Sequence, residues 1–172
     1  MANFIHAAGV NGFIKTPFQL LTAADTGFSA LTNGSKVTSA HGGALTTGIF
    51  TQSDFGNAQY ARIWMTIVTA GMTPTAGGNL SGWWLVSTDG GTTFETAEAT
   101  ASSTVPALGR PPDFVINLYE GGAALAATDI KMSGIVPLPY EACKLVVQNN
   151  SGVTFGTGAH LLTCGPVADT YG

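Results

Sequence analysis

The sequence predicts an all-β protein, and three observations lead to that prediction. Short runs rich in Val, Ile, Phe, Trp and Thr recur along the chain, and 23 Gly and 8 Pro residues interrupt them. β-Branched and aromatic residues favour strands, whereas Gly and Pro favour turns. No stretch keeps an apolar repeat of helical period over three turns. Many short strands with frequent turns indicate an antiparallel β-sandwich, and we expect it to be jelly-roll-like.

The chain divides into an arm and one domain. Residues 1–16 are rich in turn-forming residues and show no clear period. They predict an extended N-terminal arm, which is either a frayed end or a strap that orders on a neighbouring subunit. Residues 17–172 are enough for a single β-sandwich domain with one core. The candidate strands within it are 18–23, 28–32, 36–40, 46–51, 59–70, 82–88, 92–96, 114–120, 130–136, 144–149 and 158–164.

Turn signals predict three hairpins. Asn33-Gly34 between two strand-like runs is the preferred two-residue hairpin signal, because both residues tolerate positive φ. Asp89-Gly90-Gly91 predicts a second hairpin. A third is expected across the longer connection 149–158.

The period of two along a strand assigns side chains to faces. In the long run 59–70, one set of alternating apolar residues should face the core; it consists of Ala61, Ile63, Met65 and Ile67. In the run 114–120, the corresponding set is Phe114, Ile116 and Leu118. Trp83 and Trp84 are consecutive, so their indoles should point to opposite faces of one sheet. One of them should therefore meet solvent, an overlying loop or a partner.

The third hairpin would place Cys143 opposite Cys164. The two residues are then either buried free thiols or a cross-strand disulfide formed after release from the cell. A metal site formed with His160 is a further alternative, but it has no recognised ligand spacing and no fourth ligand.

Charge is scarce in this chain. Only 9% of the residues are Asp, Glu, Lys or Arg, against roughly a quarter in an ordinary soluble domain. A surface made of neutral side chains is cheap to desolvate, so we expect neighbouring subunits to cover much of it, as in a homo-oligomer or a larger assembly. The net charge of −4, with scattered cations, argues against nucleic-acid binding. No apolar run is long enough to span a membrane, and the first residues do not resemble a secretory signal, so we expect synthesis in a cytoplasm.

The sequence contains no recognisable catalytic motif. It has no G-x-S-x-G nucleophile motif, and no Gly-rich phosphate loop precedes a helical pattern. The carboxylates show no spacing that singles out an acid–base pair. We therefore expect a protein that is not an enzyme and that needs no cofactor or metal.

One local motif stabilises a turn. The residues Ser87, Asp89, Gly91, Thr93 and Phe94 resemble the Asp-box, S-x-D-x-G-x-T-aromatic, of sialidases and other β-proteins. An Asp in such a turn can accept hydrogen bonds from backbone amides. Sialidase-like enzymes carry several copies on propeller blades, whereas this chain has a single copy and no blade repeat. The motif therefore predicts a structural hairpin rather than a glycosidase.

The aromatic residues have two interpretations. Trp64, Trp83, Trp84, Tyr60 and Tyr119 are either a platform for a sugar or anchors in the core and at interfaces. We favour the second interpretation. The candidate interface residues are Phe4, Ile5, Phe13 and Ile14 of the arm, together with Trp64 and the outward member of the pair Trp83 and Trp84.

The last third of the chain resembles tailed-bacteriophage virion proteins. The residues that carry the resemblance are PDFVI at 112–116, IVPLPY at 135–140 and CKLVVQNNSG at 143–152, with a D-G-G-x-x-F-E hairpin upstream at 89–95. The resemblance implies a β-sandwich structural component of the virion, either a capsid decoration or cement protein or a tail-associated protein. Its partners would be the major capsid protein or other virion proteins. A carbohydrate-binding module on a virion surface and a tail or neck component are the alternatives.

Overall fold

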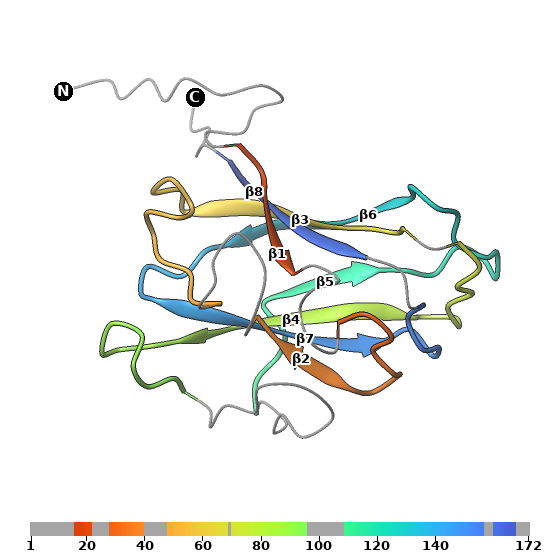
Figure 1. The fold of residues 1–172 in the computed structure, drawn as a ribbon, viewed down its shortest axis with the longest axis horizontal. Helices are drawn as coiled ribbons and strands as arrows, with labels where there is room; N and C mark the ends of the chain where they lie inside the picture. Colours follow the sequence, from red (N-terminus) through yellow and green to blue (C-terminus); the bar gives the residue numbers. More distant parts are fainter. Residues whose placement is uncertain are drawn as a thin grey trace.

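The protein folds as two antiparallel β-sheets. The computed structural model describes residues 16–21, 28–39, 48–68, 70–95, 109–156 and 160–167, and none of these residues is helical. They form eight strands, labelled in Figure 1: β1 (Phe18–Leu21), β2 (Lys36–Thr38), β3 (Tyr60–Thr66), β4 (Asn79–Val86), β5 (Phe114–Asn117), β6 (Ile130–Pro137), β7 (Cys143–Asn150) and β8 (Leu161–Val167). The all-β fold class predicted from the sequence is confirmed.

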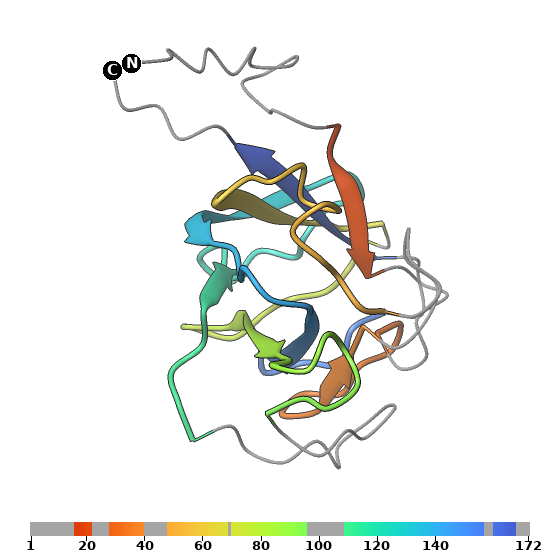
Figure 2. The same cartoon turned by 90° about the vertical axis from the view of Figure 1, so that its left-hand side faces the viewer.

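The strands are shared equally between the two sheets. One sheet has the order β1-β8-β3-β6 and the other the order β2-β7-β4-β5, and each neighbouring pair is antiparallel. Figure 2 shows the two sheets as layers, one above the other. The chain changes sheet after each of these strands except between β4 and β5. Its contacts are consequently mostly between segments far apart in the sequence.

The core lies between the two sheets. The predicted inward residues of β3 are fully buried, and so is Ile67 just beyond the strand; those in the strand are Ala61, Ile63 and Met65. Phe114, Ile116 and Leu118 are also buried, and they cover the same core from β5 and its end. The faces assigned from the period of two are therefore confirmed for both runs.

Three of the expected strands do not form as predicted. The run 28–32 contains a turn, and the part of 46–51 that the structure describes contributes only a bridge from Phe50 to Cys143. Of the run 92–96, the described residues 92–95 make no strand. The second hairpin is accordingly reduced to a turn that is closed by a single backbone bond from Glu95 N–H to the Val86 carbonyl, at 3.2 Å.

The Asn33-Gly34 signal marks a turn but no hairpin between flanking strands. Ser35 N–H donates to the Thr32 carbonyl at 3.0 Å, and Gly34 has a φ of 80°. Asn33 itself does not have a positive φ, so the geometry is not that of the expected primed turn. The strand that follows the turn, β2, pairs with β7 instead of with the residues before the turn.

The third predicted hairpin is wrong. β7 pairs with β2 and β4, whereas β8 pairs with β1 and β3 in the other sheet. Cys143 and Cys164 are thus in different sheets, and both are buried free thiols. A cross-strand disulfide between them is not formed, because the strands that carry them are not neighbours. The expected arm, with Phe4, Ile5, Phe13 and Ile14, lies outside the described residues.

Candidate functional site

The two consecutive tryptophans lie on opposite faces of β4. Trp84 is in the core between the sheets, where its ring packs edge-on against Phe50 and Phe55, with centroids 6.3 and 5.7 Å apart. Trp83 points outward, into a second apolar cluster. The predicted divergence of the two indoles is therefore observed. Neither ring is available to a partner, however, because both residues are less than 10% exposed, Trp83 at 7% and Trp84 at 3%.

The outer face of the β2-β7-β4-β5 sheet is covered by the protein's own chain around Trp83. Leu85 and Val146 lie beside Trp83 and are buried, although they point away from the main core. Phe94 packs on this cluster, and the Trp83 indole N–H donates to the Arg110 carbonyl at 3.2 Å. The burial pattern of β4, in which six consecutive residues are buried, follows from this double cover.

The Ser87–Phe94 segment forms a turn held by Asp89. Its Oδ1 accepts hydrogen bonds from the Thr92 and Thr93 amides, at 3.1 and 2.8 Å, and from the Ser87 hydroxyl, at 2.7 Å. The Ser87 hydroxyl oxygen accepts in turn from the Gly91 amide at 2.8 Å. Hydrogen bonds to the carboxylate, that from the Thr93 amide above all, lower the Asp89 pKa to about 2. Every one of these contacts is within the turn, so the motif shapes the chain and leaves Asp89 no catalytic partner among the described residues.

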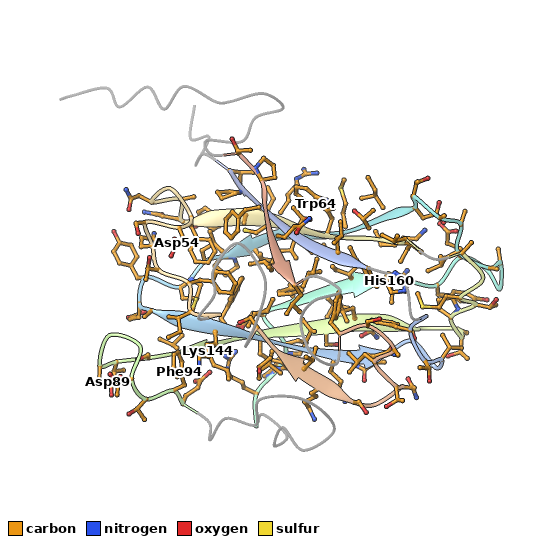
Figure 3. The ribbon with its side chains drawn as sticks, viewed as in Figure 1. Asp54, Trp64, Asp89, Phe94, Lys144 and His160 are labelled. Carbon is orange, nitrogen blue, oxygen red and sulfur yellow. The ribbon has the colours of Figure 1, made fainter. Side chains whose placement is uncertain are left out.

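The turn places Phe94 against the apolar cluster around Trp83 on the outer face of this sheet. Lys144 of β7 lies over the Phe94 ring, with its Nζ 4.5 Å from the ring centroid. Figure 3 shows Asp89 at the tip of this loop and Phe94 beside Lys144 at its base. Two successive glycines, Gly90 and Gly91, have φ values of 76° and 103°, which favour glycine over any other residue there.

Arg110 joins three parts of the same region. Its Nη1 donates to both carboxylate oxygens of Asp113, at 2.8 and 2.9 Å. Its Nη2 donates to the Trp84 carbonyl at 2.6 Å and to Glu95 Oε1 at 2.8 Å. Asp113 Oδ2 accepts in addition from the Trp84 amide at 2.7 Å. No sequence pattern indicated this cluster, because Arg110 lies 15 residues from Glu95 and 26 from Trp84 along the chain.

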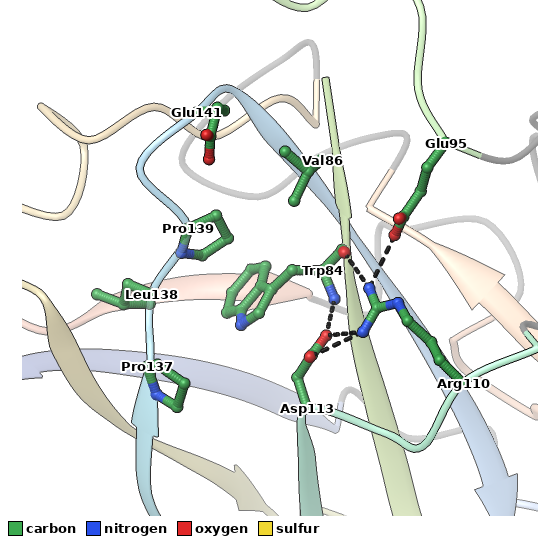
Figure 4. Close-up of a pocket in the computed structure, with 9 residues that line it drawn as sticks. All are labelled: Trp84, Val86, Glu95, Arg110, Asp113, Pro137, Leu138, Pro139 and Glu141. Carbon is green, nitrogen blue, oxygen red and sulfur yellow. Dashed lines mark hydrogen bonds and ion pairs between the residues drawn. The ribbon is translucent and has the colours of Figure 1, made fainter. Parts of the chain in front are cut away.

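A pocket of about 310 Å³ opens beside this cluster (Figure 4). In that view the Trp84 indole lies between the Pro137–Pro139 run and the Arg110–Asp113 pair. The lining contains no Ser, Cys, His or Lys; it consists of Trp84, Val86, Glu95, Arg110, Asp113, Pro137, Leu138, Pro139 and Glu141. Two of its carboxylates are bound to the one guanidinium, as in a structural ion-pair network. The pocket thus lacks a nucleophile paired with a base.

The outer face of the other sheet is different, because it stays open. The ladder of β3 with β6 places side chains of both strands side by side on this face: Tyr60 beside Pro137, Arg62 beside Ile135, Trp64 beside Met132 and Thr66 beside Ile130. We call these eight residues the β3/β6 face. Ile130, Met132 and Ile135 are 51%, 54% and 60% exposed, and Arg62 is the one charged member of the set. Trp64, which is half-buried, lies on this open side of the sheet (Figure 3).

The five aromatic residues considered for a sugar platform do not share one surface. Tyr60 and Trp64 belong to the β3/β6 face. Trp83 and Trp84 are buried on the two sides of β4, and Tyr119 lies beyond the end of β5. A flat aromatic platform made from all five is therefore not present.

The remaining candidates are buried and inert. Burial raises the pKa of the Cys143 thiol to about 12, so this thiol stays protonated. His160 is fully buried, packs edge-on against Phe155 and accepts the Val68 amide at its Nδ1, at 3.3 Å. Burial lowers the pKa of this imidazole. Among the described residues no group of His, Cys, Asp and Glu side chains could hold a metal ion, and no helix there could cross a membrane.

No family model, no curated protein and no solved structure matches this chain.

Proposed function

We propose that this chain is a non-enzymatic structural protein of a tailed-bacteriophage virion, and that it decorates or cements the capsid. It would do so by protein–protein contacts with the major capsid protein or other virion proteins, after synthesis in the host cytoplasm, and as a homo-oligomer. The observation that carries the proposal is the β3/β6 face. This face presents exposed Ile130, Met132 and Ile135 next to a single charge, Arg62, so covering it buries apolar surface and leaves one ion to be paired or kept at the solvated rim.

The strand order supports the same proposal. A sandwich with strands 1-8-3-6 over 2-7-4-5, all antiparallel, has the connectivity expected of a jelly roll, an architecture that viral capsid proteins use. The segments that resemble phage virion proteins also lie together in this fold. Residues 135–140 end β6 and begin the connection to β7, and residues 143–152 form β7 and the turn after it.

The carbohydrate-binding alternative has less support from the geometry. A sugar platform needs exposed aromatic faces, whereas Trp83 and Trp84 are buried. A tail or neck component would differ from a decoration protein in location and copy number only.

Quantitative mass spectrometry of purified particles tests the proposal. A decoration or cement protein should be present in the head in a fixed ratio to the major capsid protein, and particles that lack it should lose their genome at lower temperature. A few copies confined to the tail or neck, or absence from the particle, would overturn the assignment. A glycan array read with the purified chain tests the carbohydrate alternative, and specific hits there would favour it.

A further inference from the structure

We propose that the β3/β6 face is the docking surface for residues 1–15 of a second copy of this chain. The inference rests on the proposed function and deepens it, because it names the segment that would join one copy of the chain to the next. It starts from a contrast between the two sheets. The outer face of the β2-β7-β4-β5 sheet has Leu85 and Val146 buried under the protein's own chain, whereas the outer face of the other sheet is open.

The open face lies at an edge of its sheet. Among the described residues β6 is the last strand of this sheet and pairs with β3 alone, so the other side of its backbone has no strand partner there. It has eight residues, against four or fewer for the strands at the other three edges, β1, β2 and β5. Long apolar edges invite pairing with another chain, and proteins blunt them with charges, proline or β-bulges. β6 has Pro137 at its end and a bulge opposite Arg62–Trp64. On β6 the outward residues are Ile130, Met132, Ile135 and Pro137, and none of them is charged.

The segment that precedes the fold matches this surface in chemistry. Residues 1–15 contain one charged side chain, Lys15, and two apolar pairs, Phe4-Ile5 and Phe13-Ile14. Neither the segment nor the β3/β6 face contains Asp or Glu, and the single charge of each, Lys15 and Arg62, is a cation that has to stay at the solvated rim of the contact. An extended chain of this length reaches about 50 Å, which is enough to span the outer face of a neighbouring molecule. The same reach would let it cross its own four-stranded sheet, which is about 14 Å wide, and the cross-linking experiment below separates the two arrangements.

The position of the segment favours a second copy over the same copy. Residue 16 leads directly into β1, and β1 is the edge of this sheet that lies opposite β6. A segment that leaves one molecule at its β1 edge therefore meets the β6 edge of a neighbour placed beside it. In the single chain Met132 and Ile135 remain more than half exposed. Each copy would thus donate at one edge and accept at the other, which is a heterologous contact that closes into a ring or continues as a row.

Cross-linking of the full-length chain tests this contact directly. A photoreactive phenylalanine analogue replaces Ile135, and an equal mixture of ¹⁴N and ¹⁵N copies is irradiated and digested for mass spectrometry. We expect cross-links from position 135 to peptides of residues 1–15, half of them joining a light copy to a heavy one. The same analogue at Val115, which is 46% exposed on β5 of the other sheet, is the matched control and should give none.

Each other pattern overturns the inference. Cross-links to residues 1–15 within one isotope only would mean that the segment covers its own sheet. Mixed-isotope cross-links to β6 would mean that two faces meet directly, and the absence of cross-links would mean that the surface is not used. Peptide sequencing of the linked products separates these outcomes.

Sedimentation of surface variants provides a second measurement. Ile135→Glu and the double change Phe13→Ser with Ile14→Ser should each weaken self-association about tenfold or more, because both remove apolar contact and the first buries a charge. Val115→Glu should leave it unchanged. Loss of association in the Ile135 variant alone would overturn the role of residues 1–15. Presence of the chain in particles is measured separately, so a chain that is abundant in virions but fails these tests refutes only the inference.

Discussion

Arg110 binds Asp113 through one nitrogen, Nη1, which donates to both carboxylate oxygens at 2.8 and 2.9 Å. The same carboxylate accepts the amide of Trp84, and the second guanidinium nitrogen binds the Trp84 carbonyl. A loop residue and a residue at the start of β5 thereby satisfy both backbone groups of a core residue in β4. This cluster ties Asp113, Arg110 and Glu95 to β4.

Asp113→Ala should therefore destabilise the fold. The change leaves the Trp84 amide and the Arg110 guanidinium without their shared acceptor, and an unsatisfied group of this kind costs about 1–3 kcal/mol. Urea unfolding followed by tryptophan fluorescence measures the loss. Glu95→Gln is the matched control, because Glu95 binds the same guanidinium from an exposed position and an exposed pair contributes about 0–1 kcal/mol. Equal losses in the two variants would contradict the role assigned to Asp113.

Asp89 should make the protein sensitive to acid. Its pKa is about 2 in the folded protein against the usual 3.8, so the folded state binds fewer protons than the unfolded state between these values. The stability that Asp89 contributes is complete above about pH 4 and is lost as the pH falls toward 2. Unfolding midpoints measured across this range should fall less steeply in Asp89→Asn than in the wild type. Thr88→Ala, an exposed change in the same turn, should keep the wild-type slope.

Gly82→Ala should overpack the core beside β5. A methyl group at this position would lie 2.1 to 2.6 Å from atoms of the Phe114 ring, which is closer than any tolerated contact. We expect a loss of about 1–3 kcal/mol, partly recovered when Phe114 is also changed to Leu. Gly134→Ala on β6 is the control, since nothing lies within 4 Å of the added carbon there. Thermal unfolding measures all three variants, and a neutral Gly82→Ala would show that the ring can move aside freely.

The two cysteines should be unreactive in the native protein. Both are buried, and the raised pKa of Cys143 keeps its thiol protonated at neutral pH. Ellman's reagent should detect no thiol in the folded chain and two per chain in urea without reductant. Detection of none in urea would demonstrate a disulfide and contradict the assignment of both residues as free thiols.

Local patterns predicted the strands better than they predicted the pairings. The alternation in β3 identified its inward side chains, and the adjacent Trp83 and Trp84 had to diverge. Pairing depends on distant parts of the chain, so the turn at Asn33-Gly34 did not reveal that β2 joins β7. For the same reason the symmetric spacing around Cys143 and Cys164 suggested a hairpin that does not exist.

The same limit holds for the surfaces: local patterns predict which way a side chain points, but not which distant residues cover it. The period of two shows that Trp83 points out of the sheet, but it cannot show that the Arg110 carbonyl, 27 residues away, receives its indole N–H. The open β3/β6 face could be found only after β6 was known to be an edge strand.

The outer faces of the two sheets differ in how far the protein's own chain covers them, so the molecule has two unlike sides. The side that carries Trp83 is largely covered by its own chain, with Val115 exposed on β5, whereas the side that carries Ile135 presents three exposed apolar residues. Apolar adhesion is therefore expected mainly through the side that carries Ile135. If many copies settle on a shell through that side, they should form a coat a single molecule thick, because the outward side offers little apolar surface to a further layer.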